Sequence, residues 1–330
     1  MSSPQLDSQV SSGAIELRPF RNGDPPALVE IWRSQPAQRG LNQPLTVAQL
    51  ESFVLSKPYF DADGVIVAVE AGHPVGFVHA GFGASENQSG LDRQLGAIYA
   101  LQVRPAQRNT EVPGLLLAAA EAYLASQGSQ VFYAGGIRPL NAFYLGLYGG
   151  SELPGVLHSD LLSHQFFQAH GYREIDRVAI HQRELLGFRA PIDRQQMQHR
   201  RNLVVQATHD PTPISWWEAC TYGCFERKRF DLLPRTGGPA LASAMSWTME
   251  PLGHSWGVHA VGVTDLEVLP THRRQGLAMY LLSEAFKQLH DEGIAVVEVQ
   301  TMQQNAAAMA LYAKLGFHVA DHGSVFRKEA

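Results

Sequence analysis

The sequence predicts a mixed α/β protein built from two copies of one α+β unit, and chain length and an internal repeat carry this prediction. With 330 residues, of which 45% are hydrophobic, the chain can form two domains that each bury a core. Both halves place apolar strands and helices in the same order. Four positions recur at a constant offset of 165 residues: Leu101, Val103, Pro105 and Arg108 fall on Leu266, Val268, Pro270 and Arg273.

A second set of matches extends the repeat. At an offset of 164, Asn141, Leu147 and Tyr148 fall on Asn305, Leu311 and Tyr312. The segment FFQAHGY at 166–172 resembles LYAKLGF at 311–317 once more. A period of half the chain favours duplication of a domain over a solenoid of short repeats. The first half also carries an insertion at 149–165, which fits a lid or an interdomain contact.

The pattern divides the chain into a polar tail at 1–13, a first domain at 14–186, a linker at 187–201 and a second domain at 202–330. In the first domain we expect helices after Asp24, after Thr46, before Gly128 and from Asn141, and strands at 15–20, 64–70, 75–82, 97–103 and 130–136. In the second we expect helices at 215–225, 279–289 and from Asn305, and strands at 202–208, 240–249, 258–268 and 295–300. The linker fits a short helix and a loop equally.

Charge and composition exclude several classes of function. The net charge of −5 and the short lysine and arginine runs argue against a nucleic-acid or anionic membrane surface. Two cysteines, Cys220 and Cys224, are too few for a disulfide scaffold. The chain start lacks a signal-peptide pattern, and no apolar run approaches the roughly 20 residues of a membrane span. We therefore expect a cytoplasmic protein, monomeric or homodimeric, that acts on a small molecule or a peptide.

The stretch 261–282 has the pattern of a phosphate-binding turn. An apolar strand leads to Pro270, an arginine-rich loop, a glycine turn and an apolar helix. Free N–H groups at a helix start attract an anion such as a pyrophosphate, and small residues let it approach the backbone. A turn with solvated arginines would give the same pattern. Strict alternation along the strand places four side chains on one face, namely Val261, Val263, Asp265 and Glu267.

These residues resemble the cofactor signature of the GNAT N-acyltransferase superfamily. After a strand reading L-x-V-x-P, that family has Arg or Gln, two residues, Gly, one residue, and Gly or Ala. The chain matches it with Leu266, Val268, Pro270, Arg273, Gly276 and Ala278. A later family motif, an Asn before a helix ending in L-Y-x-x-x-G-F, is matched by Asn305, Leu311, Tyr312, Gly316 and Phe317. The resemblance implies two tandem GNAT-like domains, each a splayed mixed β-sheet flanked by helices, with acetyl-coenzyme A (acetyl-CoA) held in the opening.

The resemblance also implies roles for single residues. The backbone around Val268 and Leu269 would bind the acetyl and pantetheine parts of acetyl-CoA. A turn would bind the pyrophosphate, formed by Arg273, Arg274, Gln275, Gly276, Leu277 and Ala278. Asn305 would support the pantetheine arm. Tyr312 would give a proton to the departing thiolate, although a core aromatic beside Phe317 fits the same position.

Transfer to an amine also needs a group that removes a proton from the nucleophile. Glu267 and Asp265 are the candidates, and His259 is a third. A surface salt bridge would explain Glu267 as well, and a lone histidine on a strand is more often structural. We expect no metal ion in this chemistry.

The first half has lost parts of the signature. At the positions of Asp265, Glu267, Gly276 and Ala278 it carries Ala100, Gln102, Glu111 and Pro113. An acidic residue repels a pyrophosphate, and a proline removes an N–H donor. Arg108 and Tyr148 are retained, which leaves weak cofactor binding open. Two such domains with one competent half are similar in architecture to mycothiol synthase, a likeness that does not imply the acceptor.

The function predicted from these patterns is an N-acetyltransferase that moves an acetyl group from acetyl-CoA to a primary amine of a small molecule or a peptide. The C-terminal half would hold the active site. Two alternatives stay open: a coenzyme A-responsive binding or regulatory protein without turnover, and a transferase of a longer acyl group.

Overall fold

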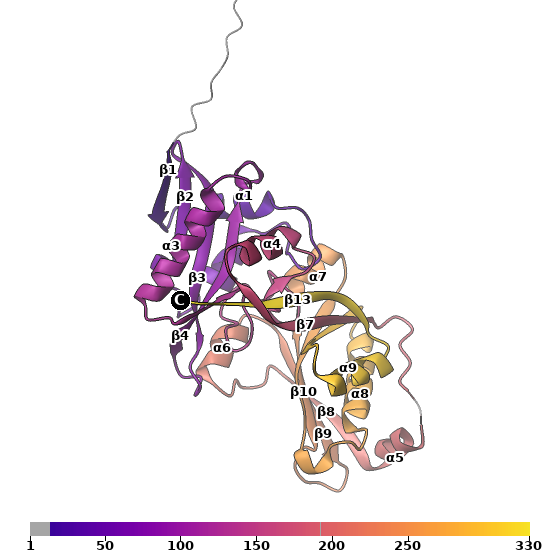
Figure 1. Cartoon of the computed structure of the whole chain (residues 1–330). Helices are drawn as coiled ribbons and strands as arrows, with labels where there is room; N and C mark the ends of the chain where they lie inside the picture. Colours follow the sequence, from indigo (N-terminus) through magenta and orange to yellow (C-terminus); the bar gives the residue numbers. More distant parts are fainter. Residues whose placement is uncertain (1–13, 192) are drawn as a thin grey trace, which may run out of the picture.

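The computed structural model describes residues 14–191 and 193–330, so the expected tail at 1–13 lies outside the described residues. In this part of the chain the strands form one continuous 13-stranded sheet of parallel and antiparallel pairs, flanked by helices (Figure 1). The predicted mixed α/β fold is therefore confirmed. None of the described helices is both long and apolar enough to cross a bilayer.

The first half follows the predicted order of elements. Its strands are β1 (Ile15–Pro19), β2 (Val65–Glu70), β3 (His73–Ala84), β4 (Leu91–Val103), β5 (Val131–Ala134), β6 (Val156–Leu157) and β7 (Arg173–Glu184). Its helices are α1 (Pro25–Arg33), α2 (Val47–Leu50), α3 (Val112–Ser126) and α4 (Leu161–Ala169), with a π-helical turn η1 (Glu51–Leu55) and 3-10 turns η2 (Ala62–Gly64) and η3 (Pro105–Gln107). Two prolines open α1, and Thr46 with Gln49 forms a capping box on α2.

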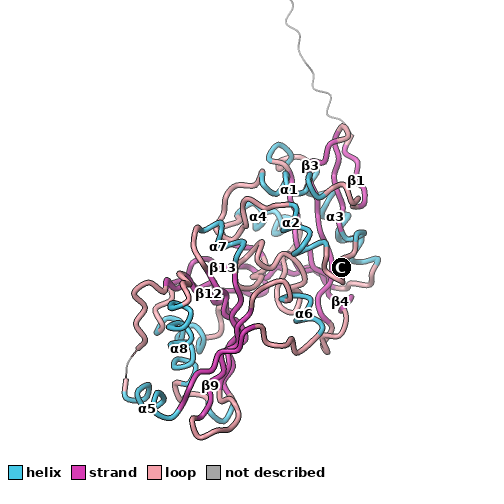
Figure 2. The backbone as a smooth tube through the Cα atoms, turned by 180° about the vertical axis from the view of Figure 1, so that it is seen from behind, coloured by secondary structure: helices cyan, strands magenta, loops and turns pink. Residues whose placement is uncertain are grey.

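The second half begins in the predicted linker, where a short helix forms. Its helices are α5 (Arg194–Asn202), α6 (Trp216–Tyr222), α7 (Glu250–Trp256), α8 (Leu277–Asp291) and α9 (Ala306–Lys314), with a 3-10 turn η4 (Pro270–His272). Its strands are β8 (Leu203–His209), β9 (Arg227–Pro234), β10 (Ala242–Thr248), β11 (Ala260–Val268), β12 (Val296–Met302) and β13 (His318–Glu329). Figure 2 shows α5 and α8 at the same end of the molecule.

Strand β9 was not expected, and its first residues explain why. Arg227 and Lys228 are buried, although the run of four charged residues at 226–229 is typical of a solvated segment. Each has an acidic partner: Arg227 Nη1 lies 2.5 Å from Glu218 Oε1, and Lys228 pairs with Glu292. These partners come from α6 and from the residue after α8, so the strand depends on contacts that are remote in sequence.

The two halves exchange their last strands at the centre of the sheet. The strand order is β1-β2-β3-β4-β5-β13-β7-β12-β11-β10-β9-β8. Strand β13 from the second half pairs with β5 of the first, and β7 from the first half pairs with β12 of the second. In Figure 1, β13 (yellow) crosses to the first half, where the chain ends. The sheet of each half is therefore completed by a strand of the other, while the sequence boundaries of the two domains stay predictions.

The helix expected from Asn141 does not form. Tyr144, Gly146, Gly149 and Gly150 all have positive φ, from 65° to 151°, so this segment folds into turns. The helix at this place in the repeat is α4. The backbone N–H of Tyr172 donates to the Phe167 carbonyl at 3.1 Å, as that of Phe317 donates to Tyr312 at 2.9 Å. The structural counterpart of Tyr312 is therefore Phe167 and not Tyr148, and the first half has no phenol there.

Candidate functional site

The central strands of the second half separate after a short parallel pairing. Strands β11 and β12 pair only from Ala260 with Val296 to Val263 with Val299, although β11 continues to Val268. A bulge in β11 shifts its register against β10, and Asp265 at this bulge has a φ of 51°. The backbone of β11 beyond Val263 thus has no partner in β12, which leaves an opening in the sheet at the predicted place.

The same bulge overturns the predicted alternation. Leu266 and Val268 pack on the second-half core together with Val261 and Val263, so all four lie on the face toward α8. Glu267 therefore lies on the opposite face. That face meets the first half, because a Cβ added to Gly262 would lie 2.7 Å from the Ser151 Cβ. Because β11 carries one extra residue, Glu267 lies on the opposite face of the strand from Val261 and Val263.

The turn after β11 has the geometry of an anion-binding helix start. Gly276 is the N-cap of α8 with a φ of 70°, and Arg274 before it also has a positive φ of 64°. Among residues 14–191 and 193–330, no side chain caps this helix, so its first N–H groups point toward the space beyond the strand end. The Arg273 Nε donates to the Val268 carbonyl at 3.2 Å, which ties the turn to the end of the strand. This turn brings Arg273, Arg274, Gln275, Gly276, Leu277 and Ala278 together beside Val268 and Leu269.

Helix α5 holds the turn from outside. Gln195 Nε2 donates to the Gln275 carbonyl at 2.9 Å, and His199 Nε2 lies 2.8 Å from the same oxygen. A Cβ at Gly276 would stand 2.9 Å from Gln195 Oε1. A side chain at Gly276 would thus need both strained backbone and a shift of the Gln195 side chain.

Tyr312 and Asn305 lie on α9, on the other side of the opening. Asn305 caps the helix, its Oδ1 accepting from the Ala308 N–H at 3.1 Å. Tyr312 is 6% exposed and packs on Phe317, with ring centroids 5.5 Å apart. Burial raises the pKa of Tyr312 to about 12, with a smaller contribution from the charge of Glu152. The phenol therefore keeps its proton at neutral pH, and the Tyr312 ring also packs in the core of the second half.

Glu152, in the insertion of the first half, is the residue that sequence reasoning missed. Its Oε1 lies 3.8 Å from Arg138 Nη1, and the same guanidinium nitrogen binds Asp265 Oδ1 at 2.8 Å. Its backbone carbonyl accepts from Gln300 Nε2 at 2.9 Å. Since Asp265 belongs to β11 and Gln300 to β12, Glu152 lies where the two strands part. Burial raises its pKa to about 7, against the effect of Arg138.

A buried carboxylate on β12 fixes the segment that carries Glu152. Glu298 is fully buried and accepts from the Ser151 N–H at 2.6 Å and from Arg39 Nη2 at 2.9 Å. Burial raises the pKa of Glu298, while Arg39 and the Ser151 N–H favour its ionised form. The insertion is thus anchored to β12 by a charge-assisted hydrogen bond immediately before Glu152.

Several buried polar atoms around Glu152 have no protein partner among the described residues. They are Ser151 Oγ, Tyr222 Oη and Gln300 Oε1. Tyr222 is close enough that the charges of Glu152, Arg138 and Asp265 act on its pKa, which burial raises. Buried polar groups are nearly always hydrogen-bonded in native proteins. These atoms therefore fit a polar ligand between the strands, and the turn at Gly276 fits the phosphates of acetyl-CoA.

The corresponding opening in the first half is filled. Strands β4 and β5 also part, after Ile98 pairs with Ala134, and residues of the insertion, among them Gly155 and Val156, line the space beside Ile98. The cavity that lies there has a volume of about 30 Å³ and is bounded among others by Tyr99, Gly155, Val156 and Phe167, which makes it small beside a cofactor pocket. As the repeat predicts, Glu111 stands at the N-cap of α3, where the second half has Gly276.

Each half contributes a mixed sheet whose strands part beside a helix start. In the second half that start carries arginines and a glycine, and in the first half the opening is filled. These features define the tandem GNAT class of fold. Residues 198–317 match the sequence profile of the acetyltransferase (GNAT) family. The architectural likeness to mycothiol synthase stays a prediction.

Curated and structural relatives agree with this class. The [Ribosomal protein bS18]-alanine N-acetyltransferase of Escherichia coli K12 is 39% identical over 56 residues, which are 17% of this chain and 38% of that protein. A tandem GNAT protein from the clavulanic acid biosynthesis pathway superposes with a TM-score of 0.63 at 14% identity, covering 96% of this chain and 98% of the other. The glucosamine N-acetyltransferase region of a fungal multi-domain β-N-acetylglucosaminidase gives 0.73 at 17% identity, covering 99% of this chain and 40% of that one.

Proposed function

We propose that the chain is an N-acetyltransferase that moves an acetyl group from acetyl-CoA to a primary amine of a small molecule or a peptide, at the opening between β11 and β12. The observation that carries the proposal is the contrast between the halves. One opening lies beside Gly276 and partnerless buried polar atoms, and the other is closed by the insertion. A single working site per chain follows from it.

In this site the turn from Arg273 to Ala278 would hold the pyrophosphate. The backbone at Val268 and Leu269, beyond the pairing of β11 with β12, would hold the acetyl and pantetheine parts. Asn305 would face the pantetheine arm from the start of α9. When bound, acetyl-CoA supplies an activated carbonyl to the amine. Tyr312, neutral at working pH, is suited to give a proton to the departing thiolate.

We assign the general base to Glu152 in preference to Glu267 and Asp265. A base works best when its pKa lies near the working pH, and burial brings the pKa of Glu152 to about 7. Asp265 is engaged by Arg138 at 2.8 Å. Glu267 is exposed on the strand face toward the first half, where it remains the candidate to test beside Glu152.

For the acceptor, we propose only the chemical group that receives the acetyl group, which is an amine. The E. coli relative is named for an alanine and the fungal region for glucosamine, so the names of both proteins specify an amine acceptor. The alternatives, a coenzyme A sensor without turnover and a transferase of a longer acyl group, use the same turn. The sensor would form no acetylated product, and the other transferase would use a donor with a longer acyl group.

The proposal is tested by calorimetry with acetyl-CoA and by mass spectrometry of products from a panel of amines. We expect one acetyl-CoA per chain, acetylated amine product, and loss of binding in Arg274→Glu. Binding without product would favour the sensor. Two molecules per chain, or unchanged affinity in Arg274→Glu, would overturn the one-site assignment.

A further inference from the structure

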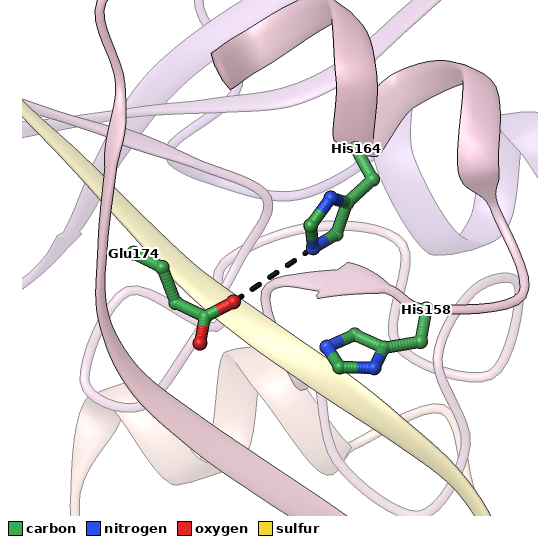
Figure 3. Close-up of side chains that lie close together, drawn as sticks. All are labelled: His158, His164 and Glu174. Atoms are coloured by element: carbon green, nitrogen blue, oxygen red, sulfur yellow. Dashed lines mark ion pairs between the residues drawn. The ribbon is translucent and has the colours of Figure 1, made fainter.

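Two histidines and a glutamate meet at one point in the first half, and the proposed transfer chemistry does not use them. They are His158 after β6, His164 on α4 and Glu174 on β7 (Figure 3). One nitrogen of each histidine and one carboxylate oxygen lie within 4.8 Å of one another. His164 Nε2 stands 3.8 Å from Glu174 Oε2.

We propose that His158, His164 and Glu174 bind one divalent transition-metal ion, with Zn²⁺ as the best match. Two imidazoles and one carboxylate are an established ligand set for Zn²⁺, and three protein ligands leave a fourth position for water. The ion would join the insertion and α4 to the first of the exchanged strands, β7, and would keep its fourth position open to water.

The surroundings of Glu174 support a ligand role. Arg177 binds the other carboxylate oxygen, Oε1, with its Nη2 at 2.6 Å and its Nε at 3.1 Å. This pairing orients Glu174 so that Oε2 points to the histidines, as outer partners of metal ligands commonly do.

A hydroxyl now stands at the meeting point of the three ligand atoms. Ser324 Oγ of β13 lies 2.9 Å from His158 Nε2 and 3.0 Å from His164 Nε2, and it donates to Glu174 Oε2 at 2.5 Å. Zn–ligand bonds of 2.0–2.1 Å require tetrahedral ligand atoms about 3.3 Å apart, so the three side chains would have to close by up to about 1.5 Å. Rotation of the Ser324 side chain would clear the centre.

The competing explanation is a hydrogen-bond centre, in which Ser324 Oγ accepts from both histidines and donates to Glu174. The two explanations differ in what Ser324 does. If the cluster is a hydrogen-bond centre, Ser324 is needed to hold the two histidines and Glu174 together. In a metal site it competes with the ion, so its removal leaves all three ligands in place.

The test is calorimetry of the tag-free, chelator-treated full chain with Zn²⁺ alone, and visible absorption with Co²⁺ to report tetrahedral coordination. We expect one ion per chain, affinity lowered at least 100-fold in His164→Ala and Glu174→Gln, and affinity kept or raised in Ser324→Ala. The matched control is His170→Ala, an exposed histidine of the same helix region, which should bind like the parent.

Thermal unfolding of each variant without metal shows that it is folded. Absence of Zn²⁺ binding in the parent chain would overturn the proposal. So would equal binding in the parent and a His158→Ala/His164→Ala double variant, because the ion would then be held elsewhere. The acetyl-CoA titration of the parent is independent of these outcomes, so failure of the metal site and failure of the proposed transfer reaction are distinguishable.

Discussion

Replacing Glu152 by glutamine should raise stability and lower activity together. Glutamine keeps the shape and cannot ionise. The pKa of Glu152 is raised from 4.5 to about 7 in the folded chain, so the fold favours the protonated form. Between pH 4.5 and 7 the unfolded chain holds fewer protons than the folded chain, and stability therefore falls as pH rises through this range.

The size of the effect follows from the shift. At 1.36 kcal/mol for each pKa unit, the ionised carboxylate costs at most about 3 kcal/mol above pH 7. The side chain is 24% exposed, so solvent screening reduces this to roughly 1 to 3 kcal/mol. Urea unfolding at pH 4.5 should find parent and Glu152→Gln alike, whereas at pH 8 the variant should be the more stable.

The rate of coenzyme A release provides the second measurement. A base acts only when ionised, so the parent rate should rise with pH to a plateau above about pH 7. Glu152→Gln should lose about 10²- to 10⁴-fold and that pH dependence with it, at unchanged acetyl-CoA affinity. Glu267→Gln serves as the matched control. If Glu267→Gln removes the pH dependence and Glu152→Gln keeps it, the base is Glu267 and our reasoning is refuted.

Three further predictions concern the turn, the acid and the exchanged strand. Gly276→Glu should weaken acetyl-CoA binding at least 100-fold in calorimetry, since it adds a negative charge at the helix start and backbone strain at a φ of 70°. The control Glu111→Gln, in the filled half, should change the acetyl-CoA affinity little. Tyr312→Phe should lower kcat about 10²-fold or more at unchanged acetyl-CoA affinity in single-turnover assays, and an unaltered kcat would leave Tyr312 with a packing role only. Phe326 is fully buried on β13, so Phe326→Ala should lower the free energy of unfolding by about 3–5 kcal/mol in urea. The control Val319→Ala, at a position 44% exposed on the same strand, should lower it far less. Equal effects would show that β13 is not needed by the first-half core.

Local patterns predicted the elements that depend on local chemistry. The helix starts after Asp24 and after Thr46, and the helix start shared by Glu111 and Gly276, all appear where the sequence places them. The opening beyond Val263 also lies where the motif puts it. Each of these features is set by a few neighbouring residues, so a single sequence is enough to read it.

Other features are set by contacts between distant parts of the chain. Nothing near Asp265 indicates that β11 carries an extra residue, and the bulge alone reversed the face of Glu267. The strand exchange is equally hidden, because β7 and β13 can complete either half. Glu152 carried one readable signal, a single carboxylate within the apolar, glycine-rich segment 149–157, but its closeness to β11 depends on that exchange.

The insertion joins the loss of one site to the completion of the other. Gly155 and Val156 of the insertion line the opening of the first half, while Glu152, four residues before Val156, reaches the opening of the second. The Ser151 N–H bound to Glu298 holds this segment in place. Removing the insertion should therefore open the first half and deprive the second of its base at once. A C-terminal half made alone would lack Glu152 and β7 together, which explains in physical terms why a filled copy of the domain is useful to the working one.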